Sequence, residues 1–569
     1  MAIKLKIWQM LAILGALFAI FFIGRAEFRI ESQLLTLPIL AFYSLYRMLI
    51  AYLAALVFAI LYGYYAATRP KTGKILIPVL DVLQSIPILG FFPAAIFFFV
   101  NAFNGNVIGI ELASIFLIFT SMAWNMTFGV YEAIISIPKD ISNAVSAFGM
   151  KKFLRFKNLI LPATVPKLVY NSMVSWAGGW YFLLASEIIS LGSSTHKLPG
   201  IGSYLLETIS KGQLSESFAG LAVLVAIIIS MDLMIWRPLS IWAEKFKYDS
   251  GHVQRPKSMV YRFYKWSPAM TSTRKMLTAT FNLILDDLEK LNDWFYNKNK
   301  ESRNFRRAEK LVRYLVLLSF FGLAAEIIWS LLTFSISMFS SEIPREAFQI
   351  PRLLLLSLFR LLAAFVISFA WTVPAAIYIM RNKNSQKYLI PFFEITAAIP
   401  APALFPAMIL LALSLTGSLE FASILLITTG MQWYILFNAM AGVKSLQIEI
   451  DEAAESFGVS KLLYYKRVLI PAMLPSLITG SVIAFGGGWN ALVVAEFVKY
   501  SGCQNGICQV EGIGAFISGV TYSTTISPDV QAKLLFLGLI SMVLMIFAIN
   551  HFFWRKIYRH VMKRYRPDG

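Results

Sequence analysis

Long apolar segments dominate this chain of 569 residues, of which 58% are hydrophobic and only 14% charged. A helix needs about 20 apolar residues to cross the ~30 Å hydrocarbon core of a bilayer. The composition therefore excludes a water-soluble chain and predicts an all-α, polytopic membrane protein. We expect about twelve transmembrane helices, at residues 7–23, 48–67, 75–101, 112–130, 165–192, 217–239, 314–335, 353–380, 388–415, 421–442, 472–498 and 532–553.

The second half of the sequence repeats the first. The tetrapeptide SLYR at 44–47 returns as SLFR at 357–360, and Glu187 in the fifth apolar segment corresponds to Glu496 in the eleventh. The chain is therefore predicted to hold two tandem six-helix repeats. Because six is an even number of spans, both repeats have the same topology and are related by a pseudo-two-fold axis along the membrane normal. The predicted parts are a first repeat at 1–243, a basic linker at 244–312 and a second repeat at 313–569.

The net charge of +20 reports orientation rather than nucleic-acid binding. Basic residues gather in the short segments between spans, as in the cytoplasmic loops of membrane proteins. This pattern places both termini and the linker in the cytosol and predicts a multi-pass protein of the plasma membrane. The linker is expected to tether the repeats, with membrane lipid as a further contact of its arginines.

The cysteine and histidine residues do not indicate a metal or catalytic site. Cys503 and Cys508 fall in one loop on the predicted outer side, so a disulfide and two free thiols remain open alternatives. The four histidines are scattered, and no HExxH or Ser/His/Asp arrangement occurs, so we expect neither a metal site nor catalytic residues. The Walker A pattern G-x-x-x-x-G-K-[ST] is missing as well, so the chain is predicted not to be an enzyme and to bind no cofactor itself.

A motif recurs between the fourth and fifth spans of each repeat. The second repeat reads EAAESFG at 452–458 and LIPAMLP at 469–475, and the first reads NAVSAFG at 143–149 and LILPATVP at 159–166. This order and spacing resemble the EAA loop of ABC importer permeases. The residues that carry the resemblance are Asn143, Ala144, Phe148, Gly149, Pro162, Glu452, Ala453, Ala454, Phe457, Gly458 and Pro471.

The resemblance implies that each loop docks into a cytoplasmic ABC ATPase homodimer, which binds and hydrolyses ATP. Small residues would let the ATPase approach the backbone of a short helix, and Phe148 and Phe457 would be buried anchors in that contact. Pro162 and Pro471 would set the angle at which the chain enters the membrane. The first loop has Asn143 where the family has glutamate, so its electrostatic contact should differ. An ordinary interfacial helix is the alternative interpretation.

Motifs in the third and fifth spans narrow the resemblance to the nitrate, sulfonate, taurine and bicarbonate permeases, in a fused form. These motifs include IP-x5-P at 86–93 and 399–406 and the run GGGWNALVVAE at 486–496. The resemblance implies a small anion as substrate and an extracytoplasmic binding protein that delivers it. A fused permease for ferric iron shares the twelve spans and the EAA loops, and an ion-coupled secondary transporter is a more distant alternative.

Charged residues mark one end of the spans in both repeats. Arg47 and Arg360 begin the second spans, and Glu187 and Glu496 end the fifth spans on the same predicted outer side. Because an unpaired charge in lipid is costly, we expect each arginine to pair with the glutamate of its own repeat. An anion-attracting gate and simple interfacial anchoring are the alternatives.

Glycine clusters lie in the middle of the fifth spans. Their first interpretation is close helix packing. The second is a translocation pathway in which backbone N–H groups or Asn490 meet the anion, with a tryptophan on either side. The candidate residues are Gly178, Gly179, Trp180, Gly487, Gly488, Trp489 and Asn490.

Overall fold

The computed structural model describes residues 35–85, 88–104, 106–150, 152–188, 198–211, 213–246, 342–446, 448–499, 507–523 and 525–565. The predicted spans at 7–23 and 314–335, Cys503 and all but the first residues of the linker lie outside this part. The described residues form helices and one short hairpin, which confirms the all-α fold class.

Seven helical stretches in the described part are long and apolar enough to cross a membrane. Length and composition alone identify them, and they agree with a polytopic chain. They are Leu37–Thr68, Val107–Ile135, Ser215–Phe246, Arg345–Arg381, Leu419–Lys444, Lys461–Ala495 and Asp529–Val561.

The first half runs through short and long helices in alternation. Its elements are α2 (Leu37–Thr68), α3 (Pro70–Ser85), α4 (Ile88–Ala102), α5 (Val107–Ile135), α6 (Lys139–Ala147), α7 (Lys152–Arg155), η2 (Phe156–Ile160), α8 (Leu161–Ile188), α9 (Ile201–Ser210), α10 (Leu214–Met231), η3 (Asp232–Trp236), α11 (Arg237–Ala243) and η4 (Glu244–Phe246).

The second half repeats that order and includes a hairpin. Its elements are η5 (Arg345–Gln349), α15 (Ile350–Arg381), α16 (Lys383–Ala398), α17 (Ala401–Thr416), α18 (Leu419–Lys444), α19 (Ile448–Ser456), α20 (Lys461–Tyr464), η6 (Tyr465–Leu469), α21 (Ile470–Ala495), β1 (Phe497–Lys499), β2 (Ile507–Gln509), α22 (Ile513–Tyr522), α23 (Pro528–Ile549), η8 (Asn550–Trp554) and α24 (Arg555–Tyr565). The strands pair antiparallel, with Val498 opposite Cys508.

The third span of each repeat is two helices rather than the single one predicted. In the second half, α16 ends at Ala398, Ile399 and Pro400 have extended backbone, and α17 begins at Ala401. The proline disfavours helical backbone at the residue before it and breaks the hydrogen-bond ladder. In the first half, α3 ends at Ser85 and α4 begins at Ile88, at the equivalent place in the repeat.

Small residues let the long helices approach one another. Along α2, Ala51, Ala55, Ala59 and Gly63 recur at every fourth position and are buried. A Cβ atom on Gly63 would lie 2.8 Å from Val130 Cγ1 of α5, so only glycine fits there. Membrane helices pack closely through such residues because lipid supplies little hydrophobic drive for their association.

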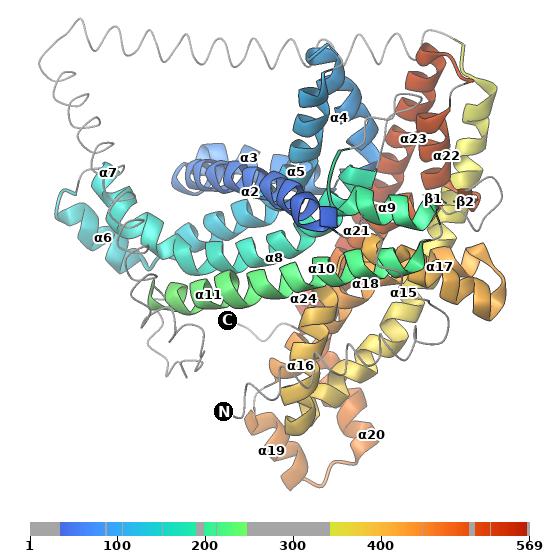
Figure 1. The fold of residues 1–569 in the computed structure, drawn as a ribbon. Coiled ribbons are helices and arrows are strands. Elements are labelled where there is room, and N and C mark those ends of the chain that lie inside the picture. Colours follow the sequence, from blue (N-terminus) through green and yellow to red (C-terminus); the bar gives the residue numbers. More distant parts are fainter. Residues whose placement is uncertain are drawn as a thin grey trace, which may run out of the picture.

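The two halves share one apolar core and meet through particular helices. Helix α8 contacts α17, and α4 contacts α21 and α22. In Figure 1, α6 and α7 lie at one extremity and α19 and α20 at another, both remote from α9, α22 and the hairpin. The protein therefore has two well-separated loop tips, whereas the short helices that follow α8 and α21 lie at its other end.

Candidate functional site

The two EAA-like loops, residues 136–160 and 445–469, fold in the same way. Each begins with a nine-residue helix, α6 or α19, which ends just before a phenylalanine and a glycine. Gly149 and Gly458 have φ angles of 65° and 62°, in the left-handed region where a Cβ is unfavourable. In the second loop, Val459 N–H donates to the oxygen of Ala454, which closes the helix with a left-handed glycine cap.

The phenylalanines before these glycines point away from the protein. Phe148 and Phe457 are each 86% exposed, although both are large apolar side chains. Ala144 and Ala453 are exposed on the same short helices, whereas Ala454 is buried against the rest of the loop. The sequence-predicted residues thus form two matching apolar tips whose neighbours are small.

The prolines of the motif lie in the first turn of the next long helix. A single π-helical turn precedes each of them, in which the Leu161 N–H donates to Phe156 O and the Ile470 N–H to Tyr465 O. A π turn widens the helix locally, which gives room for a proline ring that would otherwise strike the preceding carbonyl. Pro162 and Pro471 therefore lie inside a continuous helical path from α7 to α8 and from α20 to α21.

Each half holds a buried arginine cluster at the end opposite its loop. In the first half, Arg47 donates from Nη1 to Glu187 (2.8 Å) and from Nε and Nη2 to both carboxylate oxygens of Glu111 (2.7 Å each). Ser44 donates to Glu187 at 2.8 Å, and Glu187 also accepts the Gly202 N–H at 2.7 Å. The cluster therefore fastens the start of α9 to α2, α5 and α8.

The second half repeats this arrangement. Arg360 bonds Glu496 at 2.7 Å and Glu420 at 2.5 and 2.7 Å, and Ser357 donates to Glu496 at 2.6 Å. The Gly514 N–H donates to Glu496 at 2.7 Å, so α22 is held as α9 is. The expected pairing of each arginine with the glutamate of its own repeat is present. Because each guanidinium also binds a second carboxylate, the cluster has no excess positive charge with which to attract an anion.

Sequence reasoning missed three parts of these clusters. Glu111, in the second turn of α5, and Glu420, in the first turn of α18, were not singled out, although they occupy matching positions of the repeat. The repeated Gly-Ile-Gly at 200–202 and 512–514 was the available signal: a Cβ on Gly200 or Gly512 would lie 2.2 Å from the glutamate carboxylate. Glycine is required there because the backbone crosses directly over the carboxylate.

The candidate pathway residues separate into packed and open ones. Trp180 and Trp489 are 1% and 2% exposed, so both rings are packed in the helix core in this structure. Gly179 packs against Met48 and Met122, and Gly488 packs against Leu361 and Met431. These glycines serve close helix packing, the first of the two interpretations.

Asn490 lies where the two halves touch. Its side-chain oxygen accepts the Ile88 N–H at 2.9 Å, and its backbone oxygen accepts the Tyr181 hydroxyl at 3.2 Å. Both partners belong to the first half, on α4 and α8. Asn490 is therefore the predicted pathway residue that the structure places at the interface of the halves.

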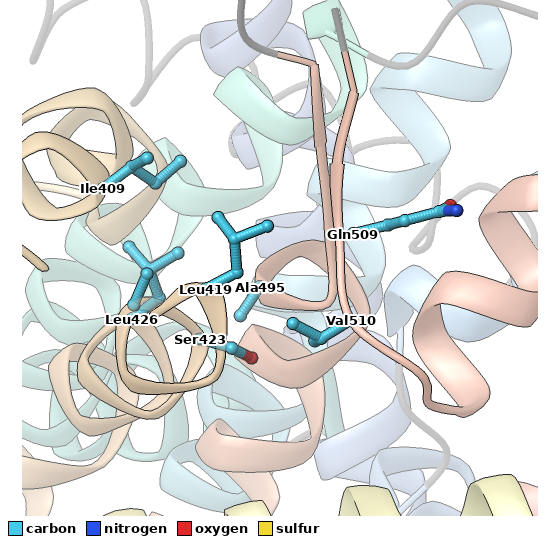
Figure 2. A pocket seen from close by; sticks show the side chains of 8 residues that line it. Ile409, Leu419, Ser423, Leu426, Ala495, Gln509 and Val510 are labelled. Atoms are coloured by element: carbon cyan, nitrogen blue, oxygen red, sulfur yellow. The ribbon is translucent and has the colours of Figure 1, made fainter. Parts of the chain in front are cut away.

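A small hollow lies between α17, α18, the end of α21 and strand β2 (Figure 2). Leu419, Leu426 and Ile409 line one side, and the Gln509 side chain extends away from them. The buried polar group in its wall is the hydroxyl of Ser423. One hydroxyl among apolar side chains provides no set of donors for a ligand, so the hollow is a packing feature.

Comparison with known proteins identifies the repeated unit. The family described as "Binding-protein-dependent transport system inner membrane component" matches residues 55–235 and again 368–555, which together exceed half of the chain. Each match contains one EAA-like loop and the long helices around it.

Individual relatives agree with the family. The chain is 32% identical over 142 residues to the taurine transport system permease protein TauC of Escherichia coli (strain K12), covering 25% of this chain and 50% of that protein. It is 27% identical over 169 residues to the nitrate import permease protein NrtB of Synechococcus elongatus, covering 30% of this chain and 56% of that protein. It is 29% identical over 188 residues to the bicarbonate transport system permease protein CmpB of the same organism, covering 33% of this chain and 63% of that protein.

These alignments span about half to two thirds of the length of the relatives, and the family unit occurs twice. A duplicated sequence, two copies of the same helix order and two family matches agree with one another. The chain therefore belongs to the family of binding-protein-dependent transport system inner membrane components and carries two such permease units in tandem.

Proposed function

We propose that this chain supplies both permease units of an ATP-driven importer, which receives a small anion from an extracytoplasmic binding protein. ATP is hydrolysed by a separate cytoplasmic ATPase homodimer, one subunit for each EAA-like loop. The observation that carries this proposal is the pair of matching tips, where Phe148 and Phe457 are each 86% exposed beside a left-handed glycine.

Charge supports the orientation. The excess of basic residues between the spans predicts that the loops carrying Phe148 and Phe457 face the cytosol, where ATP is available. The arginine clusters then lie on the outer side, together with α9, α22 and the hairpin. A binding protein would approach that surface, and the clusters would hold α9 and α22 in place beneath it.

The choice of an anion rests on the relatives and the fused motifs. TauC, NrtB and CmpB are named for taurine, nitrate and bicarbonate transport, and each is 27–32% identical to part of this chain. A pathway for such a solute must replace part of its water shell by hydrogen-bond donors.

The docking surface can be tested by truncating both tips. Because truncating an anchor residue at an interface costs about 2 kcal/mol or more, Phe148→Ala and Phe457→Ala should each weaken ATPase binding by about thirtyfold. The measurement is co-purification and titration of the ATPase against the detergent-solubilised chain. A stoichiometry of one chain to two ATPase subunits is expected.

Phe348→Ala is the matched control, since this phenylalanine is 74% exposed but belongs to η5, remote from the loops. Unaltered ATPase binding by the Phe148→Ala, Phe457→Ala double variant would refute the docking role. Uptake into vesicles with the cognate ATPase and binding protein then tests the substrate class, with labelled taurine, nitrate and bicarbonate against ferric iron. Transport of iron alone would overturn the anion and leave the importer standing.

A further inference from the structure

At two positions in the middle of the membrane helices, asparagine and tyrosine are interchanged between the halves. Asn125 on α5 corresponds to Tyr434 on α18, and Tyr181 on α8 corresponds to Asn490 on α21. Each half thus contributes one asparagine and one tyrosine, but on opposite helices. Polar side chains at this depth are costly in lipid, so they are expected to face protein or a water-filled path.

In the second half, these positions are filled and joined to the first. The Tyr434 ring lies across Gly487, where an added Cβ would come within 2.8 Å of Tyr434 Cε2. Gly487 is one helical turn before Asn490, whose backbone oxygen accepts the Tyr181 hydroxyl. Tyr181, Tyr434 and Asn490 therefore converge at the contact between the halves.

In the first half, the corresponding space is open. Gly178 is the counterpart of Gly487, yet a Cβ added to Gly178 would meet no atom within 4 Å. The residue that would reach across it is Asn125, which is exposed and lacks the ring of Tyr434. Gly178 thus borders open space, whereas its counterpart Gly487 lies against the Tyr434 ring and the Gly430 carbonyl oxygen.

We propose that Asn125, Tyr181, Tyr434 and Asn490 form the selectivity constriction of the pathway, and that the substrate passes on the Gly178 side. This inference rests on the proposed import of a small anion. Two phenol hydroxyls and two amide groups offer neutral donors for a small oxyanion that has lost part of its water. Because none of the four is charged, the anion can be recognised without being held too tightly to leave.

The Tyr181 hydroxyl has two roles in this arrangement. In the present conformation it donates to Asn490 O and ties α8 to α21, which closes the contact between the halves. Passage of the anion requires that hydrogen bond to open, and the freed hydroxyl then becomes a donor for the anion. The first-half Tyr181 and the second-half Asn490 thus act at one place from opposite sides.

Exchanging the two residue types tests the constriction. Asn125→Tyr should fill the space beside Gly178 and reduce uptake by about tenfold or more, equivalent to about 1.4 kcal/mol on the passage. Asn125→Tyr combined with Tyr434→Asn places the opening in the other half and should restore most of the uptake. The assay is uptake of labelled taurine or nitrate, whichever the unaltered importer moves, by the chain with its ATPase and binding protein in vesicles.

Val366→Tyr is the matched control, because it adds a tyrosine at a 63% exposed position of α15 outside the constriction and should transport normally. Co-purification of the ATPase reports folding of every variant. If Asn125→Tyr does not fold, Tyr181→Phe replaces it; loss of one donor should raise the substrate concentration at half-maximal uptake severalfold.

Normal uptake by Asn125→Tyr or by Tyr181→Phe would overturn the inference, as would a folded double variant that regains nothing. These results are distinguishable from failure of the proposed function. An unaltered importer that moves no anion refutes the function, whereas one that moves an anion and ignores these substitutions refutes only the constriction.

Discussion

The two halves of the chain agree at their arginine clusters and differ at their centre. Arg47 and Arg360 bind equivalent glutamates through the same guanidinium nitrogens, with distances that match within about 0.2 Å. At the centre, by contrast, Asn125 stands where the other half has Tyr434, and Gly178 borders open space whereas Gly487 lies against the Tyr434 ring. A cluster that holds helices together is needed in each half. A single pathway on the axis, by contrast, is contacted by both halves at once, so its two sides need not be the same.

A second exchange shows that packing can differ between the halves without changing the fold. Asn171 of α8 fills the notch at Gly129 of α5, and Asn438 of α18 fills the notch at Gly480 of α21. The asparagine and the glycine therefore occupy opposite helices of the pair in the two halves. Both arrangements place an asparagine against a glycine of the facing helix, although neither position keeps its residue.

The largest expected effect comes from breaking a cluster. Arg47→Ala leaves Glu187 buried without its cation, and removing one partner of a buried ion pair costs about 3–5 kcal/mol. The Arg360→Ala variant should lose less, because Glu420 is 55% exposed whereas Glu111 is 20% exposed. The measurement is the apparent free energy of unfolding in detergent.

Arg352→Ala is the control for this comparison. Arg352 pairs with Glu511 at 2.6 Å, but both side chains are more than 60% exposed, so its loss should cost less than about 1 kcal/mol. Equal destabilisation by Arg47→Ala and Arg352→Ala would show that the buried cluster is not what fastens α9 to the helices beneath it.

An intermediate effect is expected from the exchanged notch. Gly129→Asn would place its Cβ 2.4 Å from Asn171 Nδ2, and overpacking of this kind costs about 1–3 kcal/mol. The double variant Gly129→Asn, Asn171→Gly reproduces the second half and should regain most of the stability. A double-mutant cycle on the free energy of unfolding measures the coupling, and additive losses would contradict the notch interpretation.

The features that could be predicted from the sequence are those that depend on the length of apolar segments and on the repetition of motifs. Apolar length predicted the helices, duplication predicted the two units, and the paired motifs predicted two matching loops that carry Phe148 and Phe457. The pairing of Arg47 with Glu187 also followed, because a charge near lipid needs a partner. Each of these inferences uses spacing along the chain or a cost that does not depend on exact geometry.

The features that were missed depend on which face of a helix a side chain occupies. Trp180 and Gly178 are two residues apart, yet one fills the core and the other borders open space. Glu111 joins Arg47 only because α5 begins beside α2, a contact that the sequence does not display. The proline after Ile399 was a sequence signal for the helix break at this position. The apolar length of the segment nevertheless led to the prediction of a single helix.

The smallest expected effect concerns the loops, where the halves also differ. In the second loop Asp451 pairs with Arg381 of α15 at 3.1 Å and accepts a hydrogen bond from Tyr464, whereas in the first loop Ser142 stands at the equivalent position. Because Arg381 and Asp451 are each about one third exposed, Asp451→Asn should lower stability by less than about 1 kcal/mol.

Salt should remove that difference, since a partly exposed ion pair is screened at high ionic strength. We expect Asp451→Asn to be measurably less stable than the unaltered chain at low salt and to match it near 1 M salt. The comparison variant is Ser142→Ala, which removes the acceptor of the Arg155 hydrogen bond. Its effect should be nearly independent of salt, because the serine is uncharged. A salt-independent loss in Asp451→Asn would mean that the Tyr464 hydrogen bond, and not the Arg381 pair, connects the second loop to its long helix.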